Sequence, residues 1–333
     1  MRKFITIATV GVFLAATGSV ALADGPELSI GASSSYVFDV NDPDTGGNAG
    51  LYANRSNSGN ESFNIDLVQL GVAGGNGDVS YSAKFNMGDL SSSSDDGVEV
   101  MTANVTYDAG TASVPAGRID TPIGYEVLEP WGNANISRSM TWALQPVNHD
   151  GVTVSSSTSG LDIMLGVVNG LSPGNDGDDE KGLIGSVGGA AGNVDFSLSG
   201  LFSEEGDVVD VTILNLILST ELAGMDVALE ANLTELDPDV GTDVEVNSLV
   251  FYAGTDLGNT SLDARLEFVD VDDAVGGDDE LWGLTITAGW ELADGVGFRL
   301  EYRHDSSDND IYADGSGSED SVDVIQAQLV LTN

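Results

Sequence analysis

Residues that could carry out catalysis are scarce in this sequence. It contains no cysteine and only two histidines, His149 and His304, and an aspartate follows each of them. A histidine held by a carboxylate could act as a general base. Adjacent residues of an extended strand point to opposite faces, however, so neither His–Asp pair can form within a strand. We therefore expect no catalytic residues and no enzyme activity.

Oxygen ligands for a metal ion gather in two acidic segments. Ca²⁺ binds about six to eight oxygen atoms, which such segments could supply. Neither segment has the spacing of an EF-hand, so solvated acidic loops are the favoured interpretation. The alternative is a Ca²⁺ site in an outer loop, and no other cofactor is expected. The ligands of that site would be Asp176, Asp178, Asp179 and Glu180, and the second segment holds Asp272, Asp273, Asp278, Asp279 and Glu280.

Arginines interspersed with acids suggest another chemistry, the electrostatic selection of ions in a water-filled passage. Arg265, Arg299 and Arg303 share the charged faces of neighbouring segments with acidic residues. A basic row opposite acids sets up a transverse field across a pore. Charge neutralisation in a wet interior is an equally good interpretation. The residues that we expect to form a pore constriction are Arg118, Asp120, Glu126, Glu129, Arg138, Arg265, Arg299 and Arg303.

Alternation of apolar and polar residues indicates which secondary structure would hold these side chains. In 225–233 the apolar residues alternate with Asp226, Glu230 and Asn232, and the same period of two recurs in 262–268 and 296–303. This period predicts β-strands. A strand between lipid and a wet lumen needs one apolar and one polar face. We expect these residues to face lipid: Met225, Val227, Leu229, Leu262, Leu266, Phe298 and Leu300.

The alternation leaves open which face of its strand the Arg118 side chain occupies. It shares the parity of Val114 and Ala116, which would point it at lipid. A bend at Pro115 would turn it to the other face, because proline disturbs regular strand pairing. The alternation does not decide between the two orientations.

Connection lengths indicate which β architecture is present. Short, turn-like joins alternate without exception with longer polar joins, such as 41–61 and 305–320. An up-and-down outer-membrane barrel has tight turns on one side and extended loops on the other, whereas a Greek-key sandwich has no reason to show this pattern. We therefore expect an all-β fold, a transmembrane antiparallel barrel of about sixteen strands.

The N-terminal segment has the layout of a secretory signal. Met1, Arg2 and Lys3 precede an apolar run, and 21–23 form an A-x-A cleavage motif. We expect 1–23 to be a signal peptide and 24–333 to be the outer-membrane barrel. No later stretch reaches the roughly 18 consecutive apolar residues of a membrane-spanning helix.

The charge is strongly negative, with 54 acidic residues against 10 basic ones and a net charge of −44. Nucleic acid is excluded as a partner, because it would be repelled. The hydrophobic content of 41% argues against the disorder that such a charge would otherwise suggest. The charge fits cations as partners, or a saline medium that screens self-repulsion.

The longest join, 119–150, holds Trp131 and Trp142, two of the four tryptophans. A long loop rich in apolar and aromatic residues usually folds back on a surface, and the lumen is the surface available here. We expect this third outer loop to fold inward and narrow the lumen.

Within and beside this join the chain resembles the OmpL-like β-barrel porin family, also called beta-barrel porin-2. The matching residues are 117–126 (GRIDTPIGYE), 137–139 (SRS), 149–152 (HDGV) and 168–170 (VNG). The resemblance implies a porin-like barrel in which this loop contributes to the channel. It implies little about the substrate.

These observations together predict an outer-membrane porin for the passive diffusion of small polar solutes, with a modest preference for cations. Its expected partners are outer-membrane lipid, small hydrophilic solutes and cations, and further copies of the chain in a trimer. The alternative is a structural or adhesive surface barrel whose acidic loops bind divalent cations.

Overall fold

The computed structural model describes residues 26–41, 62–88, 97–171, 180–206, 208–273, 278–315 and 317–333. The segment 1–23, expected to be a signal peptide, lies outside them. In these ranges no helix is long and apolar enough to cross a membrane.

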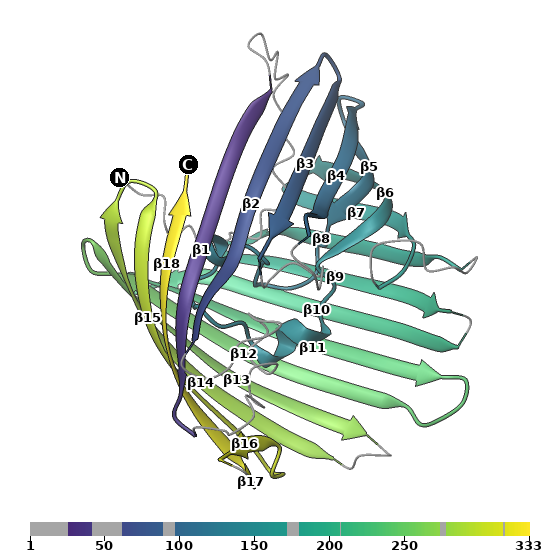
Figure 1. Cartoon of the computed structure of the whole chain (residues 1–333). Helices are drawn as coiled ribbons and strands as arrows, with labels where there is room; N and C mark the ends of the chain where they lie inside the picture. Colours follow the sequence, from purple (N-terminus) through teal and green to yellow (C-terminus); the bar gives the residue numbers. More distant parts are fainter. Residues whose placement is uncertain are drawn as a thin grey trace.

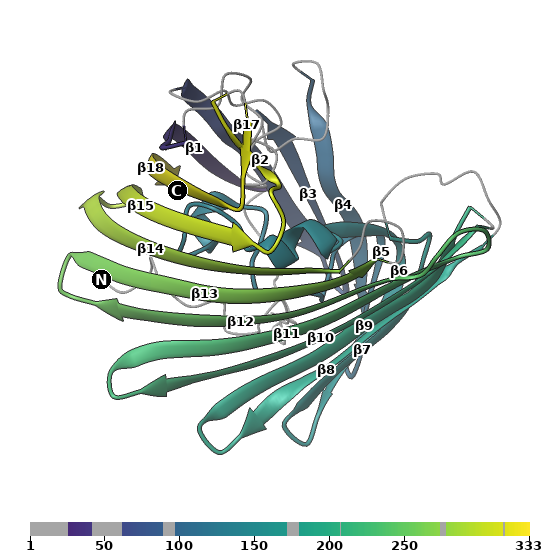
Figure 2. The same ribbon diagram turned by 90° about the horizontal axis from the view of Figure 1, so that it is seen from below.

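Sixteen antiparallel strands close into one barrel (Figures 1 and 2). Each strand pairs with its neighbours in chain order, and β1 closes the barrel against β18. The barrel strands are β1 (Glu27–Asp39), β2 (Ser62–Asn76), β3 (Val79–Met87), β4 (Glu99–Asp108), β5 (Ser113–Asp120), β6 (Asn148–Thr158), β7 (Leu161–Val168), β8 (Gly182–Ala191), β9 (Val194–Glu205), β10 (Val209–Leu222), β11 (Met225–Pro238), β12 (Val244–Asp256), β13 (Thr260–Asp273), β14 (Asp279–Ala293), β15 (Val296–Ser307) and β18 (Ser321–Thr332). The predicted up-and-down barrel is confirmed.

Tight turns join the strands on one side of the barrel. In the turn between β6 and β7, Ser159 and Gly160 have φ of 54° and 80°, and Ala223 and Gly224 between β10 and β11 have 55° and 80°. Two positive φ values at the turn centre match the right-handed twist of a hairpin, and glycine adopts them without strain. These turns account for the short joins in the sequence.

The two faces of the wall differ as the alternation predicts. Met225, Leu262, Leu266 and Leu300 are exposed on the outer face. Val227, Leu229 and Phe298 are half-buried there, in positions that alternate with buried inward residues. The inward neighbours include Glu230, Glu267 and Glu301, all at most 1% exposed. Side chains cover these carboxylates from inside the barrel.

The segment that covers them is the connection between β5 and β6, residues 121–147, which we call the inner loop. It contains two short 3₁₀ helices, η2 (Pro130–Gly132) and η3 (Met140–Leu144). Both views show this teal segment within the ring of strands (Figures 1 and 2).

The last outer connection also folds inward. Strands β16 (Tyr312–Asp314) and β17 (Gly317–Glu319) form a small hairpin between β15 and β18. Tyr312 is 2% exposed and packs against Val37, Val322 and Val324 on the inner face of β1 and β18. This hairpin narrows the long-loop end of the lumen.

Candidate pore constriction

The inner loop is held together by its own side chains. Asn133 bonds both the N–H and the carbonyl of Val127, at 2.9 and 2.7 Å. Arg138 is 1% exposed and donates to the carbonyls of Val127, Leu128 and Ile136. Its guanidinium also lies 5.6 Å from the ring centre of Trp142. Burial lowers the pKa of Arg138, and the nearby Glu126 opposes that shift. The loop is therefore a folded unit with a buried cation at its centre.

Carboxylates of the barrel wall receive the backbone N–H groups of this loop. Glu301 on β15 accepts from Ile136 and Ser137 at 2.5 and 2.9 Å. Glu267 on β13 accepts from Met140 at 2.6 Å, and Glu230 on β11 accepts from Tyr125 at 3.0 Å. A buried carboxylate is costly unless hydrogen bonds compensate for the lost water. These contacts therefore fix the loop against β11–β15.

Two arginines of the same wall also bind the loop, through its carbonyl and carboxylate groups. Arg265 donates to Glu126 and to the carbonyl of Ser137, both at 2.7 Å, and pairs with Glu267 at 3.1 Å. Arg303 pairs with Asp305 at 2.7 Å and donates to the carbonyl of Arg138. Both arginines are at most 1% exposed. Their charges are thus neutralised beneath the loop, and neither meets the solvent of the passage.

Arg299, which is half-buried, and Glu126 complete this layer of contacts. Arg299 donates to the carbonyls of Pro130 and Asn133, at 2.6 and 2.5 Å. Glu126, 6% exposed, accepts from the backbone of Ser139 as well as from Arg265. Of the predicted constriction residues, the structure therefore brings together Glu126, Arg138, Arg265, Arg299 and Arg303.

An apolar contact closes the lumen beside β7–β10. Ile123 of the inner loop packs on inward side chains of these strands. The cluster consists of Ile123, Val168, Ile184, Leu201, Val211 and Ile213, all at most 3% exposed. The loop therefore covers the wall from β7 to β15.

Solvent-accessible polar groups remain beside β2–β5. Lys84 on β3 lies 2.9 Å from Glu129 and 3.3 Å from Asp120. Side-chain exposures are 34% for Lys84, 43% for Asp120 and 16% for Glu129. Burial alone would raise the pKa of Glu129, but Lys84 and Gln69 hold it below its usual value. These groups border the wetter part of the lumen at the level of the loop.

Sequence reasoning missed Lys84 and Gln69. The alternation could have identified Lys84 as an inward residue, because it has the same parity as Ser82 and Asn86 on its strand. A single base among neutral polar residues was less conspicuous than the arginine-rich C-terminal segments.

Arg118 does not join the other predicted residues. It lies beside Ala103 and Asp150 on the outer face and binds the two oxygens of Asp150 at 2.7 and 2.9 Å. A shallow depression surrounds the pair, lined by Val100, Ala103, Gly117, Arg118, Asp150 and Gly151. Pro115 has not turned the strand, so the orientation indicated by parity holds.

The two histidines point away from the aspartates that follow them, as expected for strands. His149 faces inward and contacts the carbonyl of Gly170 and the hydroxyl of Thr121. His304 faces outward and pairs with Asp323 at 2.9 Å, whereas Asp305 points inward to Arg303. Asp323, the cross-strand partner of His304, was not predicted from the sequence.

The acidic residues proposed as Ca²⁺ ligands are only partly described. Asp176, Asp178 and Asp179 lie outside the described residues, and Glu180 is exposed. Among the residues that the structure describes, no three His, Asp or Glu side chains are placed to hold a metal ion together.

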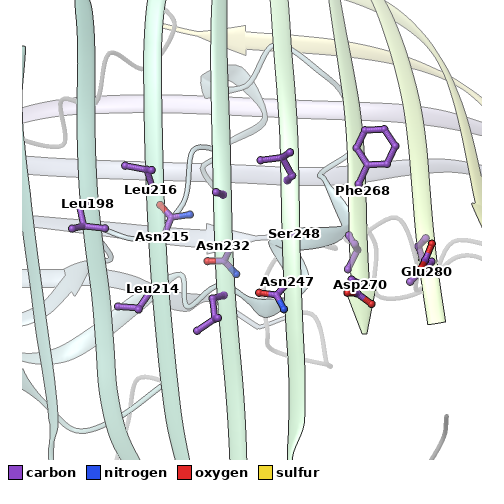
Figure 3. Close-up of a pocket in the computed structure, with 15 residues that line it drawn as sticks. Leu198, Leu214, Asn215, Leu216, Asn232, Asn247, Ser248, Phe268, Asp270 and Glu280 are labelled. Atoms are coloured by element: carbon purple, nitrogen blue, oxygen red, sulfur yellow. The ribbon is translucent and has the colours of Figure 1, made fainter. Parts of the chain in front are cut away.

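The outer surface carries a groove across β9–β14 (Figure 3). The exposed outward side chains of Leu198, Leu214, Leu249 and Phe268 line it, and Asp270 and Glu280 lie at its long-loop end. Because most of its lining faces outward, the groove belongs to the outer surface of the wall and not to the passage.

Comparison with solved structures finds the same architecture in outer-membrane proteins. A loop L8 deletion mutant of OmpT from Vibrio cholerae matches with a TM-score of 0.68 at 11% identity, covering 93% of this chain and 99% of that one. An anion-selective porin from Comamonas acidovorans gives 0.66 at 12%, with coverage of 93% and 99%. The channel DcaP of Acinetobacter baumannii gives 0.67 at 9%, with coverage of 92% and 97%. At these identities the likeness shows the fold.

A family model described as "Putative beta-barrel porin-2, OmpL-like" matches residues 31–332. No curated protein matches the sequence.

Proposed function

Because the chain belongs to the OmpL-like beta-barrel porin-2 family, an outer-membrane porin family, we propose that it lets small polar solutes diffuse passively across the outer membrane, with a modest preference for cations. The observation that carries the proposal is the inner loop. It seals most of the lumen at one level and leaves the accessible polar groups around Lys84 along the remaining wall. A narrowed, polar passage suits small hydrophilic solutes.

Acids on the inward face near the tight turns support the cation preference. They lie at the ends of β7, β9, β10, β11 and β12, and are Asp162, Asp195, Glu221, Asp226 and Asp256. The nearby inward base is Arg299, which is engaged with carbonyls of the inner loop. The Comamonas porin has a similar fold and is anion-selective, so these charges, and not the fold, would set the sign of selectivity.

The reversal potential across a KCl gradient tests this preference. We expect the barrel in a planar bilayer to select K⁺ at low salt and to lose most of that selectivity at about 1 M, where the Debye length falls to about 3 Å. Anion selectivity at low salt would contradict the proposal. A barrel that does not conduct would favour the adhesive alternative.

We also propose that the barrel assembles as a trimer through the outer face of β3–β6. This face carries Ala83, Ala103 and the Arg118–Asp150 ion pair. The outer face of β7–β15, in contrast, presents leucine and phenylalanine. Charged groups at membrane depth are usually covered by protein. One solved structure of similar fold is OmpT of Vibrio cholerae in its trimer form.

The mass of the folded barrel in mild detergent, measured by light scattering, tests this assembly. We expect three copies in the native chain. Replacing Arg118 and Asp150 together by leucine removes both charges of the pair and should lower the fraction of trimer. An unchanged trimer in this double variant would show that another face mediates assembly.

A further inference from the structure

A buried carboxylate that is only partly compensated lies on the tight-turn side of the inner loop. Asp263 on β13 is 3% exposed, and its Oδ2 has no hydrogen-bond partner. The side chain of Ser261 donates to the carboxylate, and Arg299 is a base whose charge acts on it. The nearby Arg299 directs its guanidinium to the carbonyls of Pro130 and Asn133. A carboxylate removed from water in this way is stabilised by a cation from elsewhere.

The strand register places a second carboxylate opposite Asp263. Asp226 on β11, Gly254 on β12 and Asp263 on β13 occupy one row across the inner face. Gly254 has no side chain, so the space between the two acids is not filled from the strand that separates them. Oδ1 of Asp263 lies only 2.4 Å from where a Cβ of residue 254 would stand. The carboxylate therefore extends over Gly254 toward Asp226.

A third acid and two aromatic rings adjoin this row. Asp256 follows Gly254 on the same face of β12, nearer the turn. On the other side Tyr252 contacts Tyr125 of the inner loop, with ring centroids 4.3 Å apart. The hydroxyl of Tyr252 is used in a bond to Glu230 at 3.0 Å. Burial raises the pKa of Tyr125, and the charges of Glu126, Glu230, Asp226 and Asp263 add to this shift.

We propose that Asp226, Asp256 and Asp263, together with the Tyr125–Tyr252 pair, bind the ammonium or guanidinium group of a passing solute. The carboxylates supply charge-assisted hydrogen bonds, and the tyrosine rings supply cation–π attraction. A chelated metal fits less well, because no three acids among the described residues are close enough to hold one together. The inference rests on the proposed porin function, which it narrows to positively charged organic solutes.

The position of this site suits transfer and not retention. It lies on the tight-turn side of the level at which the inner loop narrows the lumen. Further inward acids lie near the turns of neighbouring strands, Glu221 opposite Asp226 on β10 and Asp195 on β9. A solute cation that leaves Asp263 would meet further negative groups before it reaches the periplasm. Several weak sites in series allow entry without trapping the solute.

Agmatine, which carries both an amine and a guanidinium group, is the probe for the test. We expect isothermal titration calorimetry of the full barrel in detergent to show binding that Asp263→Asn and Asp226→Asn each weaken by about tenfold, as for the loss of one charge contact. Gly254→Ala should weaken it too, because the added Cβ displaces the Asp263 carboxylate. The matched control is Asp195→Asn, which removes an inward acid outside the site and should leave binding unchanged.

The outcomes separate this site from the porin function. A barrel that conducts K⁺ but does not bind agmatine, or binds it equally well in the Asp263 and Asp226 variants, overturns the site and leaves the porin intact. A barrel that binds agmatine but does not conduct keeps the site and overturns the porin. Should Asp263→Asn fail to fold, as seen by loss of heat-modifiable gel migration, Asp226→Asn and Gly254→Ala decide the matter, since Asp226 is half-exposed.

Discussion

Deleting residues 125–139 should raise the single-channel conductance by about twofold or more, because the narrowest cross-section of a pore dominates its resistance. The deleted segment contains Arg138 and Glu126, around which the inner loop is built. Without it, the wall group Glu301 would face water in place of the backbone N–H groups of Ile136 and Ser137. The measurement is conductance in a planar bilayer at fixed salt.

A matched control changes a loop of the same side that lies away from the lumen. Residues 239–243 join β11 and β12, and Val240 there is 93% exposed. Replacing Asp239, Val240 and Thr242 by glycine should leave the conductance unchanged. If the 125–139 deletion conducts like the native barrel, the inner loop does not limit the passage.

Replacing Arg265 by alanine should release the inner loop while the barrel stays closed. Arg265 bonds Glu126, Glu267 and two backbone carbonyls of the loop, and it is fully buried. Removing one partner of a buried ion pair costs about 3–5 kcal/mol, because the other charge is left uncompensated. Letting water reach Glu126 and Glu267 relieves this cost, and detachment of the loop admits that water. The wall keeps its backbone pairing.

Trypsin can report this release. Arg138 is the only lysine or arginine in 121–147 and is 1% exposed in the native barrel. We expect Arg265→Ala to be cleaved after Arg138, giving a fragment that begins at Ser139, whereas the native chain and the exposed-site control Lys181→Ala resist cleavage there. Resistance of Arg265→Ala at Arg138 would mean that the remaining carboxylate contacts suffice to hold the loop.

The barrel was predictable because its signals are local. Alternation in 225–233 and 262–268 reports which face a side chain occupies, and glycine at positive φ marks turns such as 223–224. A few residues along one segment suffice to read each of these features. The parity of Arg118 was equally local and indicated the outer face, although Pro115 left a second orientation open.

The site was harder to predict because its contacts are not local. Nothing near Arg265 in the chain indicates that Ser137 and Glu126 will neutralise it. The pattern identified the charged residues but could not distinguish an arginine beside water from one sealed beneath a loop. Asp263 escaped notice for the same reason, since its isolation depends on Gly254, on Asp226 and on where the loop lies.

The inner loop also constrains the order in which the protein can assemble. Its hydrogen bonds to β10–β15 join residues between 85 and 169 positions apart, and these partners are C-terminal to the loop, whereas Gln69 and Lys84, which bond Glu129, precede it. The loop therefore leaves the ribosome and crosses the inner membrane before the strands that anchor it. Contacts of such separation form late, because chain entropy must first be lost in bringing the strands together. A newly inserted barrel would accordingly pass through an unsealed stage, with Glu267 and Glu301 still hydrated, before the loop settles and the channel acquires its final bore.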